Sequence, residues 1–131
     1  RIANRKTKLI CVLGAAGGGR DKWKRPELGK IAGEYCSKII ITNEDPYDED
    51  PRSIMEDVRR GIESSDARCK TIEDRRLAIR EALSVAKTGD VVVITGKGSE
   101  SAIAVAGGKK ISWDDRNVVR EELNNLENSG R

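Results

Sequence analysis

The stretch from Leu9 to Pro26 constrains the fold of this chain more than any other. Its apolar run, Leu9–Leu13, is typical of a buried strand and stops at Gly14. A loop of small residues and a cluster of cations then lead to Pro26, which suits the first turn of a helix. A strand, a glycine loop and a basic helix start together offer backbone N–H groups to an anion. The stretch predicts either an anion site or a tight turn with solvated charges beside it.

The glycine loop matches neither of the common phosphate-binding fingerprints. No Gly-Lys-Ser/Thr sequence follows its glycines, and the G-x-G-x-x-G spacing of dinucleotide-binding folds is absent. The candidates for contacts with a phosphate or nucleotide are Gly18, Gly19, Arg20, Asp21 and Lys24.

Composition excludes several classes of function. The 131 residues suit one domain, and aromatic residues make up only 3%, which argues against a protein that stacks the bases of single-stranded nucleic acid. The net charge of +3 comes from 25 basic and 22 acidic residues, a balance too mixed for a nucleic-acid footprint. No apolar run is long enough to span a membrane and no signal peptide is visible, so we expect a cytoplasmic protein.

The three cysteines, Cys11, Cys36 and Cys69, are widely spaced, and the chain has no histidine. This pattern makes a structural zinc site implausible, and we predict no metal site. In a cytoplasmic protein the three side chains are expected to be reduced thiols.

Strand and helix patterns alternate along the chain. We expect strands at residues 9–14, 39–42 and 90–95, a short one near 69–72, and helices at about 25–37, 51–62, 73–88 and 115–126. We interpret residues 1–8 as a lead-in to the first strand and residues 127–131 as a frayed tail. We expect a hairpin turn at residues 107–110. This order predicts a single α/β domain over residues 1–131, with a Rossmann-like, mainly parallel sheet flanked by helices.

Two of these elements carry predictions about the core. In the first helix, Leu28, Ile31, Ala32 and Tyr35 form one apolar stripe, and in the second Ile54, Val58 and Ile62 do so. The strand at residues 90–95 is continuously hydrophobic, as expected of a central strand that is covered on both faces.

Three loops follow strands and should meet at one edge of a parallel sheet: residues 14–25, 43–50 and 96–100. The first is basic, the second acidic, and the third carries Lys97 and Glu100 between glycines. A basic and an acidic patch side by side suit a zwitterion such as an amino acid. Taken singly, each of these charges is more simply a solvated loop residue, so the prediction depends on their convergence.

Four segments resemble the C-terminal domain of Mur ligases, most closely the UDP-N-acetylmuramoyl-tripeptide synthetase branch. They are residues 20–29 (RDKWKRPELG), 42–51 (TNEDPYDEDP), 73–79 (EDRRLAI) and 96–100 (GKGSE). The resemblance covers roughly residues 9–126, and the four segments occur in the same order as in the family. It implies part of an ATP-dependent amide ligase of peptidoglycan synthesis, which joins a free amino acid to UDP-MurNAc-L-Ala-D-Glu. There are two alternatives. One is the corresponding domain of a sister ligase, folylpolyglutamate or cyanophycin synthetase, and the other is a non-catalytic nucleotide- or anion-binding module.

The resemblance also implies site residues, none of them catalytic in its own right. Arg25 would contact the carboxylate of the incoming amino acid, and Gly96 and Glu100 its far end. The segment Glu44, Asp45, Pro46 and Tyr47 falls where the family has its specificity motif, Asp-Asn-Pro-Arg in the diaminopimelate enzymes. Asp45 and Tyr47 stand in place of that Asn and Arg. We therefore hypothesise that the incoming amino acid has a side chain that ends in an amine, as in lysine or ornithine. Ser99 and Gly19 are further departures from the family pattern.

Other parts of such an enzyme are absent from the sequence. There is no P-loop, no UDP-binding domain, and no Asp-Tyr-Ala-His-Thr-Pro segment before the first strand. We therefore expect a fragment whose partners are the missing N-terminal and central domains, with ATP and Mg²⁺ bound mainly outside it. The isolated fragment is expected to be inactive as a ligase.

Overall fold

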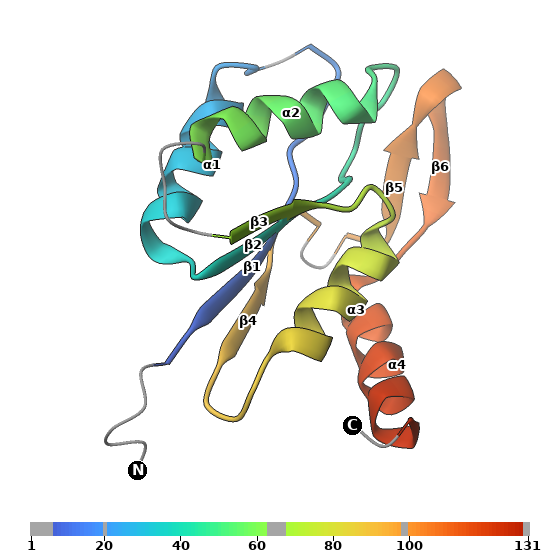
Figure 1. The fold of residues 1–131 in the computed structure, drawn as a ribbon. Helices are drawn as coiled ribbons and strands as arrows, with labels where there is room; N and C mark the ends of the chain where they lie inside the picture. Colours follow the sequence, from blue (N-terminus) through green and yellow to red (C-terminus); the bar gives the residue numbers. More distant parts are fainter. Residues whose placement is uncertain (1–6, 20, 63–67, 98–99, 130–131) are drawn as a thin grey trace.

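The computed structural model describes residues 7–19, 21–62, 68–97 and 100–129 (Figure 1). Its strands are β1 (Leu9–Leu13), β2 (Lys38–Ile41), β3 (Arg68–Thr71), β4 (Val91–Ile94), β5 (Ala102–Val105) and β6 (Lys109–Ser112). Its helices are α1 (Lys24–Tyr35), α2 (Pro51–Ile62), α3 (Arg75–Val85) and α4 (Asp115–Asn128), with a 3-10 turn at Ala106–Gly108. The predicted α/β class and the turn near 107–110 are confirmed.

The main sheet is parallel, with strand order β3-β2-β1-β4. Its side chains alternate between two faces. On one face Cys11, Leu13, Ile39 and Ile41 pack in the core under α1 and α2, and on the other Ile10, Val12 and Ile40 pack against α3. Figure 1 shows the two helix layers on opposite sides of the sheet. Burial on both faces accounts for the continuous apolar runs in β1 and β2.

The predicted central position of the strand at residues 90–95 is wrong, because β4 lies at an edge of the sheet beside β1. Val92 and Ile94 pack toward α3 and α4, whereas Val91 and Val93 are 48% and 36% exposed. In β4 the continuous apolar run therefore indicates neither burial on both faces nor a neighbouring strand on each side. In the described part of the chain, α1 and α2 leave the second face of β4 uncovered.

The predicted apolar stripe of α1 is also wrong in part. Ile31 and Tyr35 are 54% and 71% exposed, and the buried side of the helix carries Arg25, Gly29 and Ala32. The reason is the close approach of α1 to α2: a methyl group at Gly29 would overlap the carbonyl of Val58. In α2 the predicted face of Ile54, Val58 and Ile62 is confirmed, with Met55 added to it.

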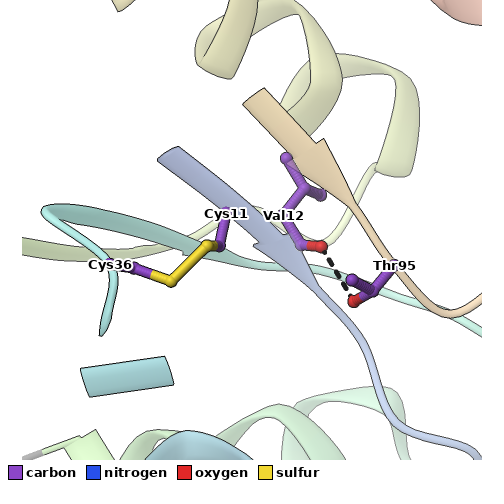
Figure 2. Close-up of a disulfide and its surroundings, with 4 residues drawn as sticks. All are labelled: Cys11, Val12, Cys36 and Thr95. Atoms are coloured by element: carbon purple, nitrogen blue, oxygen red, sulfur yellow. Dashed lines mark hydrogen bonds between the residues drawn. A yellow bond between two sulfur atoms is a disulfide. The ribbon is translucent and has the colours of Figure 1, made fainter. Parts of the chain in front are cut away.

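Cys11 and Cys36 form a disulfide, which corrects the expectation of three reduced thiols (Figure 2). Cys36 closes the C-terminus of α1 by donating its N–H to Ala32. The chain then turns into β2, which pairs with β1, and this return brings the two Cα atoms to 6.3 Å. That separation lies within the ordinary range for a disulfide. Cys69 is a free thiol.

Three of the helices begin at an aspartate cap. Asp50, Asp74 and Asp114 each accept a hydrogen bond from a backbone N–H of the first turn of the helix that follows. The last helix runs to Asn128, so residues 127 and 128 are helical and the expected frayed tail is wrong for them. Residues 1–6 of the expected lead-in and 130–131 of the tail lie outside the described residues.

A buried carboxylate fastens α4 to α3. Glu122 of α4 is 1% exposed and accepts hydrogen bonds from Arg80 and Arg76 of α3. Arg80 contributes most to lowering the pKa of Glu122 to about 2, with Arg76 adding to it and burial opposing it. The ion pairs therefore favour the folded state as long as Glu122 is ionised.

A first prediction concerns the contact between α1 and α2. Gly61→Ala should lower the free energy of unfolding by about 2 kcal/mol, because the added methyl overlaps the Pro26 carbonyl and this strain outweighs the better helix propensity of alanine. Urea unfolding measures the change. Arg60→Ala, at the exposed neighbouring position, should stay within about 0.5 kcal/mol. Equal effects of the two substitutions would contradict the close packing of the helices.

A second prediction concerns pH. Glu122→Gln should lower the free energy of unfolding by about 2 kcal/mol at pH 7. The pKa of Glu122 is lower in the folded protein, so its ionised form stabilises the fold fully above pH 4.5, and the contribution disappears as the pH falls toward 2. Urea unfolding at a series of pH values should therefore show the difference shrinking in acid. Exposed Glu127→Gln is the control, and a difference that is independent of pH would contradict the assignment.

Candidate functional site

Three loops meet at the carboxyl end of the parallel sheet, as predicted. The loop after β1 donates the N–H of Gly17 to the carbonyl of Asp45, which lies in the loop after β2, at 2.7 Å. It also donates the N–H of Gly19 to the carboxylate of Glu49 at 3.2 Å. The loop after β4 joins them through Lys97, whose Nζ lies 2.8 Å from Asp45. Segments far apart in the sequence therefore form one connected surface.

Arg25 is the centre of the first group of contacts. Its guanidinium binds Glu49 in a bidentate pair at 2.7 and 2.9 Å, and donates to Asp57 of α2 and to the Ala16 carbonyl at 3.0 Å each. These bonds use all four N–H groups of its two terminal nitrogens. The hydrogen bond from Arg25, helped by the N–H of Gly19 and opposed by burial, lowers the pKa of Glu49 to about 2.

The geometry gives Arg25 an internal role that differs from the predicted one. The residue is only 2% exposed, and a substrate carboxylate would have to displace Glu49 or Asp57 to reach it. Direct contact between Arg25 and an amino acid stays a prediction. What the contacts show is that Arg25 ties the glycine loop, the acidic loop and α2 together.

Lys97 is the centre of the second group. Its Nζ donates to both carboxylate oxygens of Asp45, at 2.8 and 2.9 Å, and to Glu100 at 2.7 Å, so all three of its protons are used. Burial alone would lower the pKa of Lys97, but the hydrogen bonds to the two carboxylates outweigh it and the pKa is raised. Lys97 therefore stays charged and cross-links two of the predicted site residues.

Glu44 lies between two of the glycines at this edge. Its Cβ would be 3.0 Å from a Cβ placed on Gly14, and its Oε1 would be 2.5 Å from one on Gly96. Gly96 also has a φ of +109°, which disfavours any other residue. Burial, and then the neighbouring charge of Asp45, raise the pKa of Glu44. A cation placed beside Glu44 would be stabilised by that carboxylate.

The hairpin of β5 and β6 forms the outer wall of the site. Ala104 of β5 donates its N–H to Asp45 at 2.8 Å and accepts from the N–H of Tyr47 at 3.2 Å. Tyr47 adopts a left-handed φ of +53°, which is uncommon for a residue with a side chain, and Pro46 beside it is buried. A groove of about 470 Å³ opens here, lined by Asp45, Tyr47, Lys97, Glu100, Ser101, Ala102, Ala104 and Lys110.

A second cavity, of about 330 Å³, lies beside the glycine loop. Asp21 and Lys24, two of the predicted phosphate contacts, line it together with residues 14–17, Arg25 and Leu28. Gly18 and Gly19 are exposed nearby, and Arg20 lies outside the described residues. Lys24 is exposed and pairs loosely with Asp21 at 3.3 Å, so it could turn toward an anion. Contact of these residues with a phosphate group stays a prediction.

The described residues contain no group of three or more metal-ligating side chains, and no helix among them is long and apolar enough to cross a membrane. Sequence reasoning missed the roles of Arg75 and Asp115, which form a buried ion pair at 2.8 Å beneath the loops. The segment containing Arg75 was noted only for its family resemblance, and nothing local in the sequence indicates a partner 40 residues away.

Comparisons with known proteins agree with one another. The family description "Mur ligase, glutamate ligase domain" matches residues 1–98. UDP-N-acetylmuramoyl-L-alanyl-D-glutamate–2,6-diaminopimelate ligases are similar: that of Nitrosomonas europaea is 43% identical over 126 residues, or 96% of this chain and 23% of the relative. That of Aquifex aeolicus is 47% identical over 120 residues, or 90% of this chain and 24% of the relative.

A solved structure of a ligase with the same name superimposes with a TM-score of 0.85 at 35% sequence identity. The match covers 93% of this chain and 25% of the solved one. The chain thus spans about a quarter of the length of the proteins it resembles.

A third prediction tests the charges of the groove. Burial, and then the charge of Asp45, raise the pKa of Glu44, and the charges of Arg75 and then Lys97 partly oppose this rise. In Lys97→Met the pKa of the Glu44 carboxyl should therefore rise further, measured by its ¹³C chemical shift against pH. Lys87→Met, at an exposed position, is the matched control. An unchanged Glu44 titration in Lys97→Met would contradict the electrostatic effect of Lys97 on Glu44.

Proposed function

Because the chain belongs to the Mur ligase family, we propose that it is the C-terminal domain of an ATP-dependent amide ligase that adds the third amino acid to UDP-MurNAc-L-Ala-D-Glu. The names of its relatives support this assignment, and so does its span of about a quarter of their length. Residues 1–131 then form one domain that works with N-terminal and central domains of the same polypeptide, in the cytoplasm. The main structural support for this proposal is the groove in which Lys97 joins the acidic loop to the second glycine loop.

The reaction needs positioning from this domain rather than a nucleophile or a tuned base. In the proposed reaction a carboxylate of the peptide substrate takes the terminal phosphate of ATP to form an acyl phosphate, ADP is released, and ATP and Mg²⁺ would be held mainly by the central domain. The amine of the incoming amino acid then displaces phosphate and forms the amide. The task of this chain is to orient that amine and exclude water, which by itself can supply a large share of a rate enhancement.

The charges of the groove favour a diamino acid with one carboxylate. Lys97 is neutralised by Asp45 and Glu100, so among the described residues of the lining Lys110 is the remaining cation and suits a single carboxylate. Glu100 is largely exposed and has an oxygen that Lys97 does not use, and this oxygen suits an ammonium group. We infer that lysine or ornithine fits better than meso-diaminopimelate, whose second carboxylate would face Asp45 and Glu100 without an arginine.

The glycine loop contributes to the same function from the other side. The proposed contacts to the phosphate of a nucleotide held by another domain are Gly18, Gly19, Arg20, Asp21 and Lys24, and in support Asp21 and Lys24 line the cavity beside the glycine loop. Arg25 acts by keeping this loop against the acidic loop through Glu49 and the Ala16 carbonyl. A direct contact of Arg25 with the amino-acid carboxylate would require that carboxylate to replace one that the guanidinium already binds.

A fourth prediction follows for the full-length enzyme. Supplied with ATP, Mg²⁺ and UDP-MurNAc-L-Ala-D-Glu, it should release phosphate with lysine or ornithine at a kcat/KM at least about tenfold above that with meso-diaminopimelate, because an unpaired charge costs more than 1.4 kcal/mol. Tyr47→Arg should raise turnover of diaminopimelate and lower that of lysine. Product masses identify the amino acid that has been added.

Two outcomes would contradict the proposal at different levels. Preference of the unchanged enzyme for diaminopimelate would overturn the inferred specificity and leave the ligase assignment intact. No phosphate release with any amino acid, together with binding of nucleotide, would favour the non-catalytic nucleotide- or anion-binding alternative. Turnover with folyl or aspartyl substrates instead would favour a sister ligase.

A further inference from the structure

Arg75 is a buried cation that lies beneath the site and outside the groove. It is the first residue of α3, and its side chain is 1% exposed. Its Nε and one terminal nitrogen bind the carboxylate of Asp115 at 2.9 and 2.8 Å. Because this pair is bidentate, the plane of the guanidinium is fixed and its remaining N–H groups point in defined directions.

Those remaining N–H groups bind two carbonyls that matter for the site. Arg75 donates to the carbonyl of Asn43 at 3.0 Å and to that of Thr95 at 2.8 Å. Asn43 is the residue before Glu44 and Asp45, and Thr95 is the residue before Gly96 and Lys97. Each of the two site loops therefore begins one residue after a carbonyl held by the same guanidinium.

No strand pairing joins these two carbonyls directly, although the N–H groups of Thr42 and Thr95 still bond to β1. β2 and β4 are not neighbours, because β1 lies between them in the sheet. The backbone of β1 leaves the sheet at Gly14, and the side chain of Glu44 fills the space between Gly14 and Gly96. Beyond the ends of the strands, the rigid span of Arg75 replaces the hydrogen-bond ladder.

Neighbouring contacts keep Arg75 in place. Trp113, which follows the β5–β6 hairpin, donates its Nε1–H to Asp115 at 2.6 Å. Thr95 makes a second contact, from its hydroxyl to the Val12 carbonyl at 3.1 Å, so its own position relative to β1 is set (Figure 2). The hairpin wall, the start of α4 and both loops thus depend on one buried ion pair.

We propose that Arg75 is a positioning residue for the incoming amino acid: it sets the spacing between the loop of Glu44 and Asp45 and the loop of Gly96 and Lys97, and so determines how tightly the amino acid binds. The inference deepens the proposed function and depends on it for the identity of the ligand. A lysine at position 75 would keep the charge but could not bind the carboxylate and two carbonyls in one plane.

The test compares Arg75→Lys with Arg76→Lys in the full-length enzyme. Arg76 is the next residue and pairs with Glu121 and Glu122, away from the groove, which makes it a matched control. Arg75→Lys should raise the KM for the amino acid at least tenfold, with the KM for ATP and for the UDP-linked substrate within twofold. Arg76→Lys should leave all three within twofold. Equal rises in every KM, or an unchanged KM for the amino acid, would overturn the proposal.

A second measurement needs no activity. Hydrogen–deuterium exchange of the full-length protein should become faster in the peptides that contain Asn43–Asp45 and Thr95–Lys97 in Arg75→Lys, and in neither in Arg76→Lys. Faster exchange in an enzyme that turns over no amino acid would retain the positioning role and reject the proposed function. Unchanged exchange in both peptides would reject the positioning role. If Arg75→Lys does not fold, Trp113→Phe replaces it, with a smaller rise in the same KM and faster exchange at the same two peptides.

Discussion

Buried cations hold the carboxyl edge of the parallel sheet together. The hydrogen-bond ladder ends where the strands end, and the loops beyond them need other partners. Arg25, Arg75 and Lys97 supply these partners, each at most 3% exposed and each bound to at least one carboxylate. Removing one member of a buried pair of this kind costs about 3 to 5 kcal/mol, because the other charge is left without a partner. The site is therefore rigid where it touches the sheet.

The same contacts decide which charges a ligand can meet. Arg25 pairs with Glu49 and Asp57, Lys97 with Asp45 and Glu100, and Arg75 with Asp115. Five carboxylates thus face three cations, and Glu44 adds a sixth whose raised pKa reflects its burial and its acidic neighbour. An excess of negative charge in a partly buried edge favours a ligand that brings an ammonium group. The acidic side chains of residues 43–50 mainly balance buried cations within the fold. Only the negative charge that is left over is available to a ligand.

The sequence was sufficient for the helices and for the four strands of the main sheet, but not for strands β5 and β6 or for the surroundings of some elements. Helix α2 was predicted with its buried face because Ile54, Val58 and Ile62 repeat every four residues and Asp50 and Pro51 mark its start. Helix α1 was predicted with the wrong face, because Gly29 lets two backbones approach and glycine carries no hydrophobic signal. The edge position of β4 and the Cys11–Cys36 disulfide depend on which strands become neighbours, and local patterns do not encode that.

For the site, the convergence of the three loops could be predicted, since parallel strands end at a common edge. The pairing of charged side chains within the site could not be predicted. Arg25 finds Glu49 and Asp57 at separations of 24 and 32 residues, and Lys97 finds Asp45 at 52. In the sequence each of these residues is one more charge on a loop, equally compatible with solvent, a ligand or an internal partner.

The internal pairing changes what the departures from the family motif mean. Asp45, where the diaminopimelate motif has asparagine, accepts from Lys97 and from the N–H of Ala104, so its negative charge is balanced within the domain. Tyr47, where that motif has arginine, lines the groove without adding a positive charge. The two substitutions together leave a site with less positive charge for a second carboxylate. Under the proposed function, specificity would follow from the cation that is absent at position 47 more than from the acid that is present at position 45.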